Sequence, residues 1–160
     1  MQKKDSTLQD HAMMQEALQE AQLAFERGEV PVGAILAVEG KILARARNRV
    51  EELRDASAHA ELLCLREGAQ KLRDWRLLEA TLYTTLEPCL MCAGALFLFR
   101  IKRVVWGAPD LRHGANGSLT DVFTLPHPTH SLIIEGGLYE EESAALLRAF
   151  FKQQRKKVLS

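Results

Sequence analysis

Two short motifs in this sequence contain residue types that bind metal ions and transfer protons. The first is His59-Ala60-Glu61, and the second places Cys89 and Cys92 three residues apart directly after Pro88. One imidazole and two thiolates are zinc ligands, and three protein ligands leave one tetrahedral position open, as in catalytic sites. Glu61 is then the candidate for relaying a proton from a metal-activated water. Such a centre suits hydrolysis at an electron-poor carbon, for example the amine-bearing carbon of a nucleobase.

Each motif opens a predicted helix, and this placement explains how the ligands meet. One helix is predicted over 58–68 with Ser57 as its cap, and the other over 89–99, where the sequence is apolar all round and predicts a buried helix. First-turn side chains lean beyond a helix N-terminus, so two helix starts that face each other would gather the ligands. The partial positive charge of both helix ends favours ionised thiols.

Two other interpretations of the cysteines remain open at this point. A redox pair would explain Cys89 and Cys92 but would leave the histidine and the glutamate without a role. A structural zinc site would need a fourth ligand, and Cys64 lies in the middle of a predicted helix, five residues after His59. We interpret Cys64 as a small buried apolar residue. Three cysteines do not make a disulfide framework, and free thiols are typical of a cytoplasmic protein.

The pattern along the chain predicts a single domain over 1–160. An amphipathic helix is expected over 7–27, capped by Thr7 and ended by Gly28. Strands are expected at 32–38, 41–46, 81–85, 103–106 and 132–134, and a last helix at 140–157, with loops over 47–57 and 108–130. This order predicts an α/β fold with three layers, α/β/α, around a central mixed five-stranded sheet.

Composition excludes several classes of protein. The 160 residues include 21 Lys and Arg against 21 Asp and Glu, and 47% are hydrophobic. A zero net charge excludes a globally basic nucleic-acid binder and a highly charged disordered chain, although it allows a local basic patch. No apolar run approaches the roughly 20 residues that span a bilayer, so no membrane partner is expected.

Beyond these local arguments, the sequence resembles the cytidine/deoxycytidylate deaminase superfamily, and most closely its members that deaminate adenosine in tRNA. The resemblance is most specific over 29–33, 48–49, 58–61, 85–95 and 114–118. It implies a cytidine-deaminase-like fold and one zinc ion per subunit on His59, Cys89 and Cys92. It also implies that Glu61 shuttles the proton, that the product is inosine at the wobble position of a tRNA anticodon, and that the protein is a homodimer.

The resemblance also implies residues that bind the substrate. Asn48 would hold the flipped base, because an amide offers both a donor and an acceptor; its alternative role is that of a simple turn residue. Val30, Pro31 and Leu86 would form an apolar wall of the base pocket. The residues that would contact the RNA are Asp110, His113, Phe151, Lys152 and Arg155. Ordinary core packing, solvated loop residues and a basic helix end are the competing explanations.

Two rival functions follow from the same residues. One is an enzyme of the same fold that deaminates free guanine, cytosine or a nucleotide, which the zero net charge favours. The other is a non-catalytic, zinc-containing RNA-binding partner subunit. The presence of Glu61 argues against this second rival, because a module without chemistry needs no carboxylate there.

Overall fold

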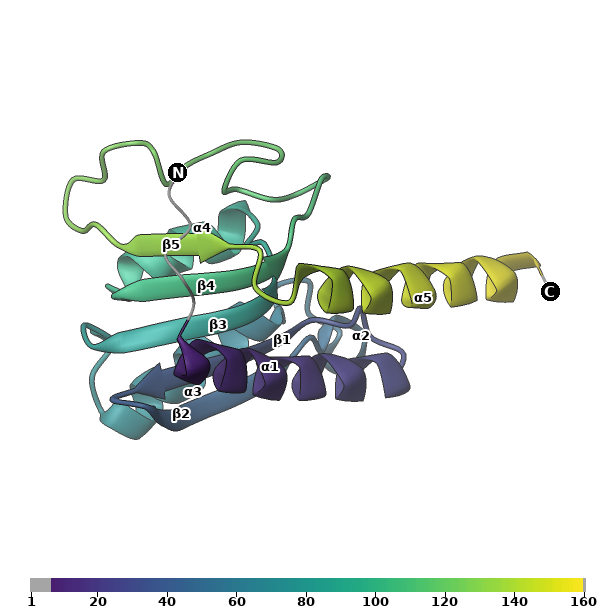
Figure 1. The fold of residues 1–160 in the computed structure, drawn as a ribbon, viewed down its shortest axis with the longest axis horizontal. Helices are drawn as coiled ribbons and strands as arrows, with labels where there is room; N and C mark the ends of the chain where they lie inside the picture. The colour runs from purple at the N-terminus through teal and green to yellow at the C-terminus, as the bar shows by residue number, and fades with distance from the viewer. Residues whose placement is uncertain (1–6, 160) are drawn as a thin grey trace.

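A computed structural model describes residues 7–159, which form a mixed five-stranded sheet with helices on both faces (Figure 1). The strand order is β2-β1-β3-β4-β5, with β1 antiparallel to both neighbours and β4 parallel to both. The strands are β1 (Gly33–Val38), β2 (Lys41–Arg47), β3 (Ala80–Leu86), β4 (Arg103–Ala108) and β5 (Ile133–Gly136). The helices are α1 (Leu8–Glu26), α2 (Val50–Leu53), α3 (Ala60–Leu72), α4 (Leu90–Leu98) and α5 (Glu140–Leu159). The predicted fold class is confirmed.

Local signals in the sequence set the first three elements. Thr7 caps α1 in a capping box, in which its hydroxyl accepts from the Asp10 N–H at 3.1 Å and the Asp10 carboxylate accepts from the Thr7 N–H at 3.2 Å. The β1–β2 hairpin turns at Glu39 and Gly40, whose φ angles are 50° and 76°. A two-residue turn with two positive φ angles matches the twist of the paired strands, so the predicted hairpin forms where it was expected.

The central strands β1, β3 and β4 are buried on both faces, and alternation along them divides the core into two halves. Leu36, Leu82 and Val104 lie side by side and pack toward α3 and α4. Their neighbours Ile35, Tyr83 and Val105 point to the other face, where α1 covers them. Figure 1 shows α1 and α5 together on one side of the sheet and α3 and α4 on the other. Among the described residues, no helix combines the length and hydropathy needed to cross a bilayer.

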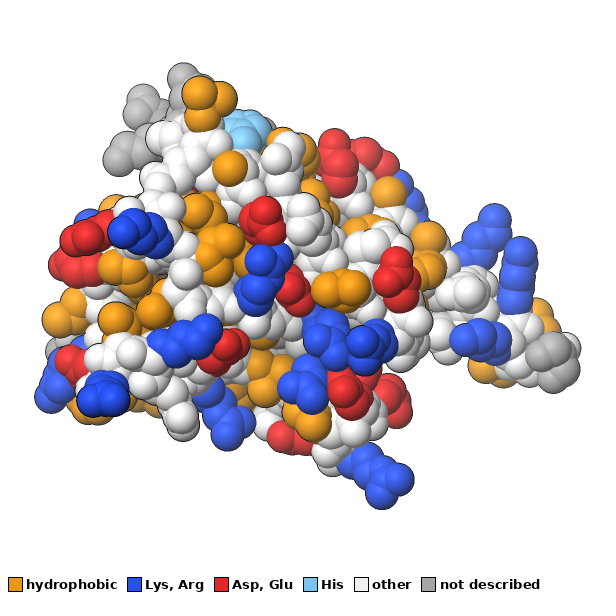
Figure 2. Space-filling view, turned by 90° about the horizontal axis from the view of Figure 1, so that it is seen from below, with side chains coloured by type: hydrophobic (Ala, Val, Ile, Leu, Met, Phe, Trp, Pro, Cys, Tyr) orange, Lys and Arg blue, Asp and Glu red, His pale blue; other side chains and the backbone are white. Residues whose placement is uncertain are grey.

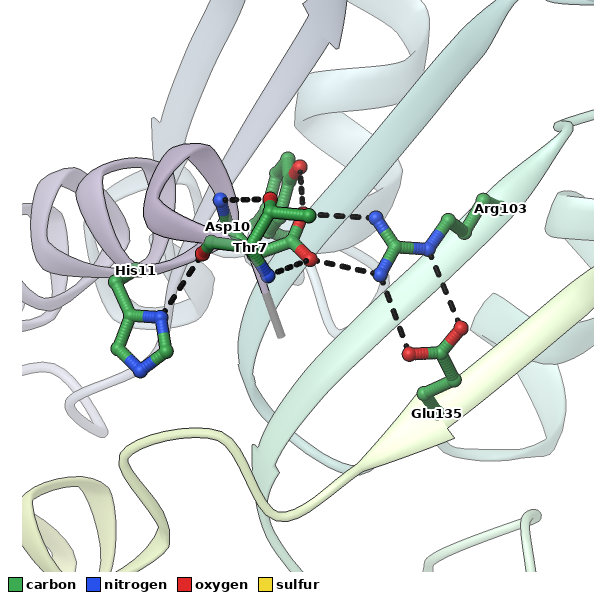
Figure 3. A network of polar contacts seen from close by, with 6 residues as sticks. Thr7, Asp10, His11, Arg103 and Glu135 are labelled. Carbon is green, nitrogen blue, oxygen red and sulfur yellow. Dashed lines mark hydrogen bonds and ion pairs between the residues drawn. The ribbon is translucent and has the colours of Figure 1, made fainter. Parts of the chain in front are cut away.

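A buried carboxylate connects α1 to the sheet on the face that α1 covers. Asp10 is 2% exposed and accepts two hydrogen bonds from the Arg103 guanidinium, at 2.7 and 2.9 Å (Figure 3). Tyr83 donates to the same carboxylate at 2.6 Å, and Glu135 pairs with the outer side of Arg103 at 3.2 Å. The hydrogen bonds from Arg103, and then the one from Tyr83, hold the pKa of Asp10 far below its ordinary value.

We expect Asp10→Asn to lower the free energy of unfolding by roughly 3 kcal/mol near neutral pH, because it removes a buried carboxylate that is the main partner of the half-buried Arg103 guanidinium. A carboxylate with a lowered pKa in the folded state stabilises the protein above the unfolded-state pKa of about 3.9, and this stabilisation decreases as pH falls below it. The difference between variant and parent should therefore be smaller near pH 3 than near pH 7. Urea unfolding at both pH values measures the free energy of unfolding of parent and variant, and Asp74→Asn, at an exposed residue, is the control. An equal difference at both pH values would contradict this account.

Three sequence predictions are wrong in detail. The predicted loop over 47–57 contains the short helix α2, whose first N–H groups are satisfied by Glu29 from a distant segment. Ser57 does not cap α3, because its N–H and hydroxyl both donate to Asp55, and the helix starts after His59. The α4 helix is not buried all round: Leu90, Met91 and Leu98 are 51%, 39% and 64% exposed.

Candidate metal centre and active site

The two predicted metal-binding motifs meet where α3 and α4 begin. His59 is the N-cap residue of α3 and Cys89 is the N-cap residue of α4. Both have extended backbone, and neither side chain makes a capping hydrogen bond. His59 Nδ1 lies 3.5 Å from Cys89 Sγ and 3.6 Å from Cys92 Sγ. All three candidate ligand atoms lie within 4.8 Å of one another. The structure therefore brings together the three ligands that the sequence predicted.

The spacing of these atoms fits a zinc ion. Zinc bonds of about 2.3 Å to sulfur and about 2.0–2.1 Å to nitrogen, at tetrahedral angles, place nitrogen and sulfur about 3.6 Å apart. The observed separations from His59 Nδ1 to the two sulfurs agree with this value. His59, Cys89 and Cys92 are thus positioned to coordinate zinc, and three ligands leave a tetrahedral position for water or substrate.

The electrostatics of the cluster favour a thiolate even before a metal binds. A hydrogen bond from Cys92, followed by one from His59, lowers the pKa of Cys89 to about 4. The hydrogen bond to Cys89, together with burial, raises the pKa of Cys92, so the pair retains one proton, on Cys92. The hydrogen bond with Cys89 also raises the pKa of His59. Metal binding displaces the remaining proton, because zinc binds thiolates.

Glu61 lies in the first turn of α3 and is 4% exposed. Burial raises the pKa of its carboxyl group. The charge of His59 lowers this pKa and the charge of Cys89 raises it. A buried carboxyl group whose pKa is raised, beside a metal centre, has the properties of a proton carrier. Cys64, in contrast, is fully buried and donates to the Ala44 carbonyl at 3.5 Å, outside the metal cluster. Its interpretation as a small apolar residue is confirmed.

The predicted pocket residues lie at the ends of β1, β2 and β3. Asn48 follows β2, is 7% exposed, and donates its backbone N–H to the Val32 carbonyl at 3.0 Å. Pro31 is buried, and the half-buried Val30 and Leu86 pack against the core on the α3 and α4 side. Both the base-pocket and the core interpretation are compatible with this position.

The predicted RNA contacts fall into two groups. Asp110 belongs to the loop after β4, accepts from the N–H groups of Arg112 and His113, and acts electrostatically on His59. His113 is exposed beside it. Phe151, Lys152 and Arg155 instead line a hollow of about 440 Å³ on α5. Because α5 packs on β4, β3 and α1, the structure does not bring these three residues to the metal cluster.

Two buried glutamates next to the site were not singled out by sequence reasoning. Glu29 accepts from the N–H groups of Glu51 and Glu52 at 3.0 and 2.8 Å and so positions the segment that follows Asn48. Glu87 accepts from the loop after β4. Each is the only charged residue of a mostly apolar stretch that contains one proline, over 28–38 for Glu29 and over 80–99 for Glu87. A lone charge in an apolar stretch could have identified them. Burying a charge costs free energy, so such a residue is expected to have hydrogen-bond partners elsewhere in the fold.

Comparison with known proteins agrees with this geometry. Residues 7–108 match the family model described as the cytidine and deoxycytidylate deaminase zinc-binding region. The tRNA-specific adenosine deaminase of Bacillus subtilis is 46% identical over 149 residues, which cover 93% of this chain and 92% of that protein. The chloroplastic tRNA(adenine(34)) deaminase of Arabidopsis thaliana is 47% identical over 89% of this chain, but the match spans only 12% of that longer protein.

Solved structures show the same relationship. A structure from work on A-to-I editing by tRNA:A34 deaminases at the wobble position of transfer RNA has a TM-score of 0.79 and 44% identity, covering 85% of this chain and 99% of that one. The guanine deaminase of Bacillus subtilis has a TM-score of 0.60 and 26% identity, covering 91% and 92%. This chain therefore belongs to the cytidine and deoxycytidylate deaminase family, and it groups there with the bacterial tRNA-specific adenosine deaminases.

Proposed function

We propose that this protein hydrolyses adenosine to inosine at the wobble position of a tRNA anticodon and releases ammonia. The main support is the convergence of His59, Cys89 and Cys92 with the buried carboxyl group of Glu61, in a chain that shares 46% identity with an enzyme of that name. Water adds to the ring carbon that bears the amine, and the amine leaves, so one water is consumed for each ammonia released. An anticodon loop presents unpaired bases, which lowers the cost of moving one into a pocket.

In this mechanism each site residue has a separate role. His59, Cys89 and Cys92 hold the zinc ion, which when bound supplies the Lewis acidity that makes water a nucleophile near neutral pH. Glu61 accepts the first proton of the attacking water and delivers it to the purine ring. It then takes the second proton from the newly added hydroxyl and passes it to the departing amine. Its burial keeps the proton away from bulk solvent during these transfers.

The base would be held by residues at the strand ends. Asn48 offers an amide donor and acceptor to the edge of the purine, and Glu29 fixes the segment that follows it. Val30, Pro31 and Leu86 would form the apolar wall on which the ring packs. Asp110 and His113 would contact the RNA beside the flipped base.

A local basic patch on α5 supports an RNA contact, although the net charge is zero. The second half of α5 extends past the ends of the strands (Figure 1), and Lys and Arg side chains surround its free end (Figure 2). Exposed Phe151 and the neighbouring Lys152 and Arg155 combine a ring for stacking with charges that follow a phosphate backbone.

We expect the double variant Lys152→Ala/Arg155→Ala to weaken tRNA binding and to reduce the slope of log K against log[salt]. Each lost phosphate contact removes about 0.7–0.9 from that slope, so the pair should lower it by about 1.4–1.8. Titrations from low to high salt by fluorescence anisotropy measure the slope. The matched control Lys71→Ala/Lys102→Ala removes two charges that pair with Glu67 and Glu79, and its slope should equal that of the parent. Equal slopes for all three proteins would exclude α5 from the RNA contact.

A free-base deaminase is the second candidate, favoured by the structural match to the Bacillus subtilis guanine deaminase. Purified protein should be incubated in parallel with a transcribed tRNA bearing a wobble adenosine, with the same transcript bearing guanosine there, and with free guanine and cytosine. Inosine in the first transcript alone supports tRNA editing. Ammonia release from a free base without inosine in the tRNA would overturn our proposal and support this alternative.

We further propose that the protein acts in the cytoplasm as a homodimer. The exposed apolar side chains of Leu90, Met91 and Leu98 on α4 offer a surface for a second copy, and a reducing compartment keeps Cys89 and Cys92 available as ligands. Sedimentation equilibrium should give twice the chain mass of 18.0 kDa. A monomer at micromolar concentration would contradict the assignment.

A further inference from the structure

The carboxylate of Glu87 is buried at the end of β3 and has no ion-pair partner among residues 7–159. It is 1% exposed and follows the last residue of the strand. Its charge is instead met by donors from one loop: the N–H groups of Asp110 at 3.1 Å, Asn116 at 2.8 Å and Ser118 at 3.3 Å, and the Ser118 hydroxyl. A buried carboxylate is tolerated when several such donors converge on it.

The loop is folded closely around this carboxylate. A Cβ atom on Gly114 would lie 2.2 Å from Cδ of Glu87, so only glycine allows the backbone to approach this near. Asp110 and Asn116 donate to different oxygens of the carboxylate, which therefore joins the two ends of the 110–116 segment. Without the carboxylate, three half-buried backbone N–H groups would lose their acceptor at once.

The same loop is attached to the metal-binding segment. The Ala115 N–H donates to the Pro88 carbonyl at 2.8 Å, and Gly114 pairs with Cys89 in an isolated β-bridge. On the other side, the Glu87 N–H donates to the Ala108 carbonyl at 2.8 Å. Glu87 therefore lies between the ligand Cys89 and the loop that bears Asp110 and His113.

We propose that Glu87 is a positioning residue that fixes the 110–118 loop against the metal-binding segment and thereby sets the affinity for the RNA substrate. It takes no part in proton transfer, because the loop encloses its carboxylate. The statement about RNA rests on the proposed function, whereas the statement about the loop does not.

The test is Glu87→Gln, which keeps the shape of the side chain but directs an NH₂ group at donors. Carboxamide geometry leaves one oxygen to accept, so at least one backbone N–H of the loop loses its partner. We expect zinc content near one per chain and cleavage by trypsin after the exposed Arg112 accelerated by tenfold or more. With an anticodon stem-loop bearing a wobble adenosine, KM should rise by about 10–100-fold while kcat changes less than about threefold.

Two further variants separate positioning from general stability. Tyr83→Phe removes a buried hydrogen bond to Asp10 from the same strand, so it should lower the melting temperature without changing Arg112 cleavage or KM. Ser118→Ala removes a single donor, so it should shift cleavage and KM in the same direction as Glu87→Gln but less. It should add nothing in the Glu87→Gln background, because the two act through one contact.

Unchanged cleavage and KM in Glu87→Gln would overturn the proposal, as would a fall in kcat alone. If Glu87→Gln fails to fold or loses zinc, Ser118→Ala decides: faster cleavage after Arg112 with full zinc supports positioning, and unchanged cleavage overturns it. Cleavage is read by mass spectrometry and does not depend on the reaction. A parent protein that forms no inosine would therefore refute the proposed function, while the cleavage rates would still test Glu87.

Discussion

Glu61→Gln is expected to keep the fold and the metal while lowering kcat for inosine formation by roughly 10²–10⁴-fold, the usual contribution of a general acid–base group. The amide cannot accept the proton of the attacking water or return it to the leaving amine. Because the side chain is buried and nearly isosteric with glutamine, packing around the first turn of α3 should be unchanged. Glu61→Ala should show the same loss of turnover with zinc retained.

Turnover under saturating anticodon stem-loop, zinc content by mass spectrometry and the far-ultraviolet circular dichroism spectrum together check this prediction. Glu67→Gln is the matched control, since it makes the same change on the same helix at an exposed residue paired with Lys71. It should retain full activity. Inosine formation by Glu61→Gln at the parental rate would remove Glu61 from the mechanism, and loss of zinc would assign it a role in the metal site instead.

The parts of the fold and site that the sequence predicted are those that depend on neighbouring residues. Thr7 and Asp10 define the start of α1 within four residues, and Glu39-Gly40 defines a hairpin turn within two. The metal cluster was also predictable, although its members are distant in sequence. His59 and Cys89 each open a helix, and helix starts direct first-turn side chains outward.

The parts that sequence reasoning missed depend on partners far along the chain. The α2 helix has four residues and forms where Glu29, 22 residues before Glu51, accepts from its first N–H groups. The donors to Glu87 lie 23 to 31 residues after it. Local propensity contains no information about such contacts, because only the closed tertiary fold brings the carboxylate to the loop.

The exposed face of α4 was missed for another reason. A helix that is apolar on every side gives no amphipathic pattern, so the sequence predicts burial everywhere. In the folded chain Cys92, Ala93 and Leu96 face the core, while Leu90 and Leu98 remain exposed. In the homodimer that we propose, a second copy of the chain would cover these residues, and a pattern in one chain cannot place such a contact.

His59→Ala is expected to lose most of the bound zinc and, with it, the stability that the metal provides. Two thiolates at the start of α4 remain, but a tetrahedral site with two protein ligands binds zinc far more weakly than one with three. Zinc binds the folded chain and so stabilises it by RT ln(1 + [Zn]/Kd), which is about 4 kcal/mol at a free concentration of 1,000 Kd. A chelator should therefore lower the melting temperature of the parent and leave that of His59→Ala almost unchanged.

The control must lose a histidine without losing a ligand. His127 stacks on Phe97 with ring centroids 4.7 Å apart, in the loop after β4, and is outside the metal cluster. His127→Ala should keep one zinc per chain and the parental response to chelator. If His59→Ala instead retained full zinc, the imidazole ligand would have to come from another residue. Because Glu61 follows His59 by only two residues at the start of α3, the proton carrier would then also lose its place beside the metal. The hydrolytic centre would have to be assigned to different residues.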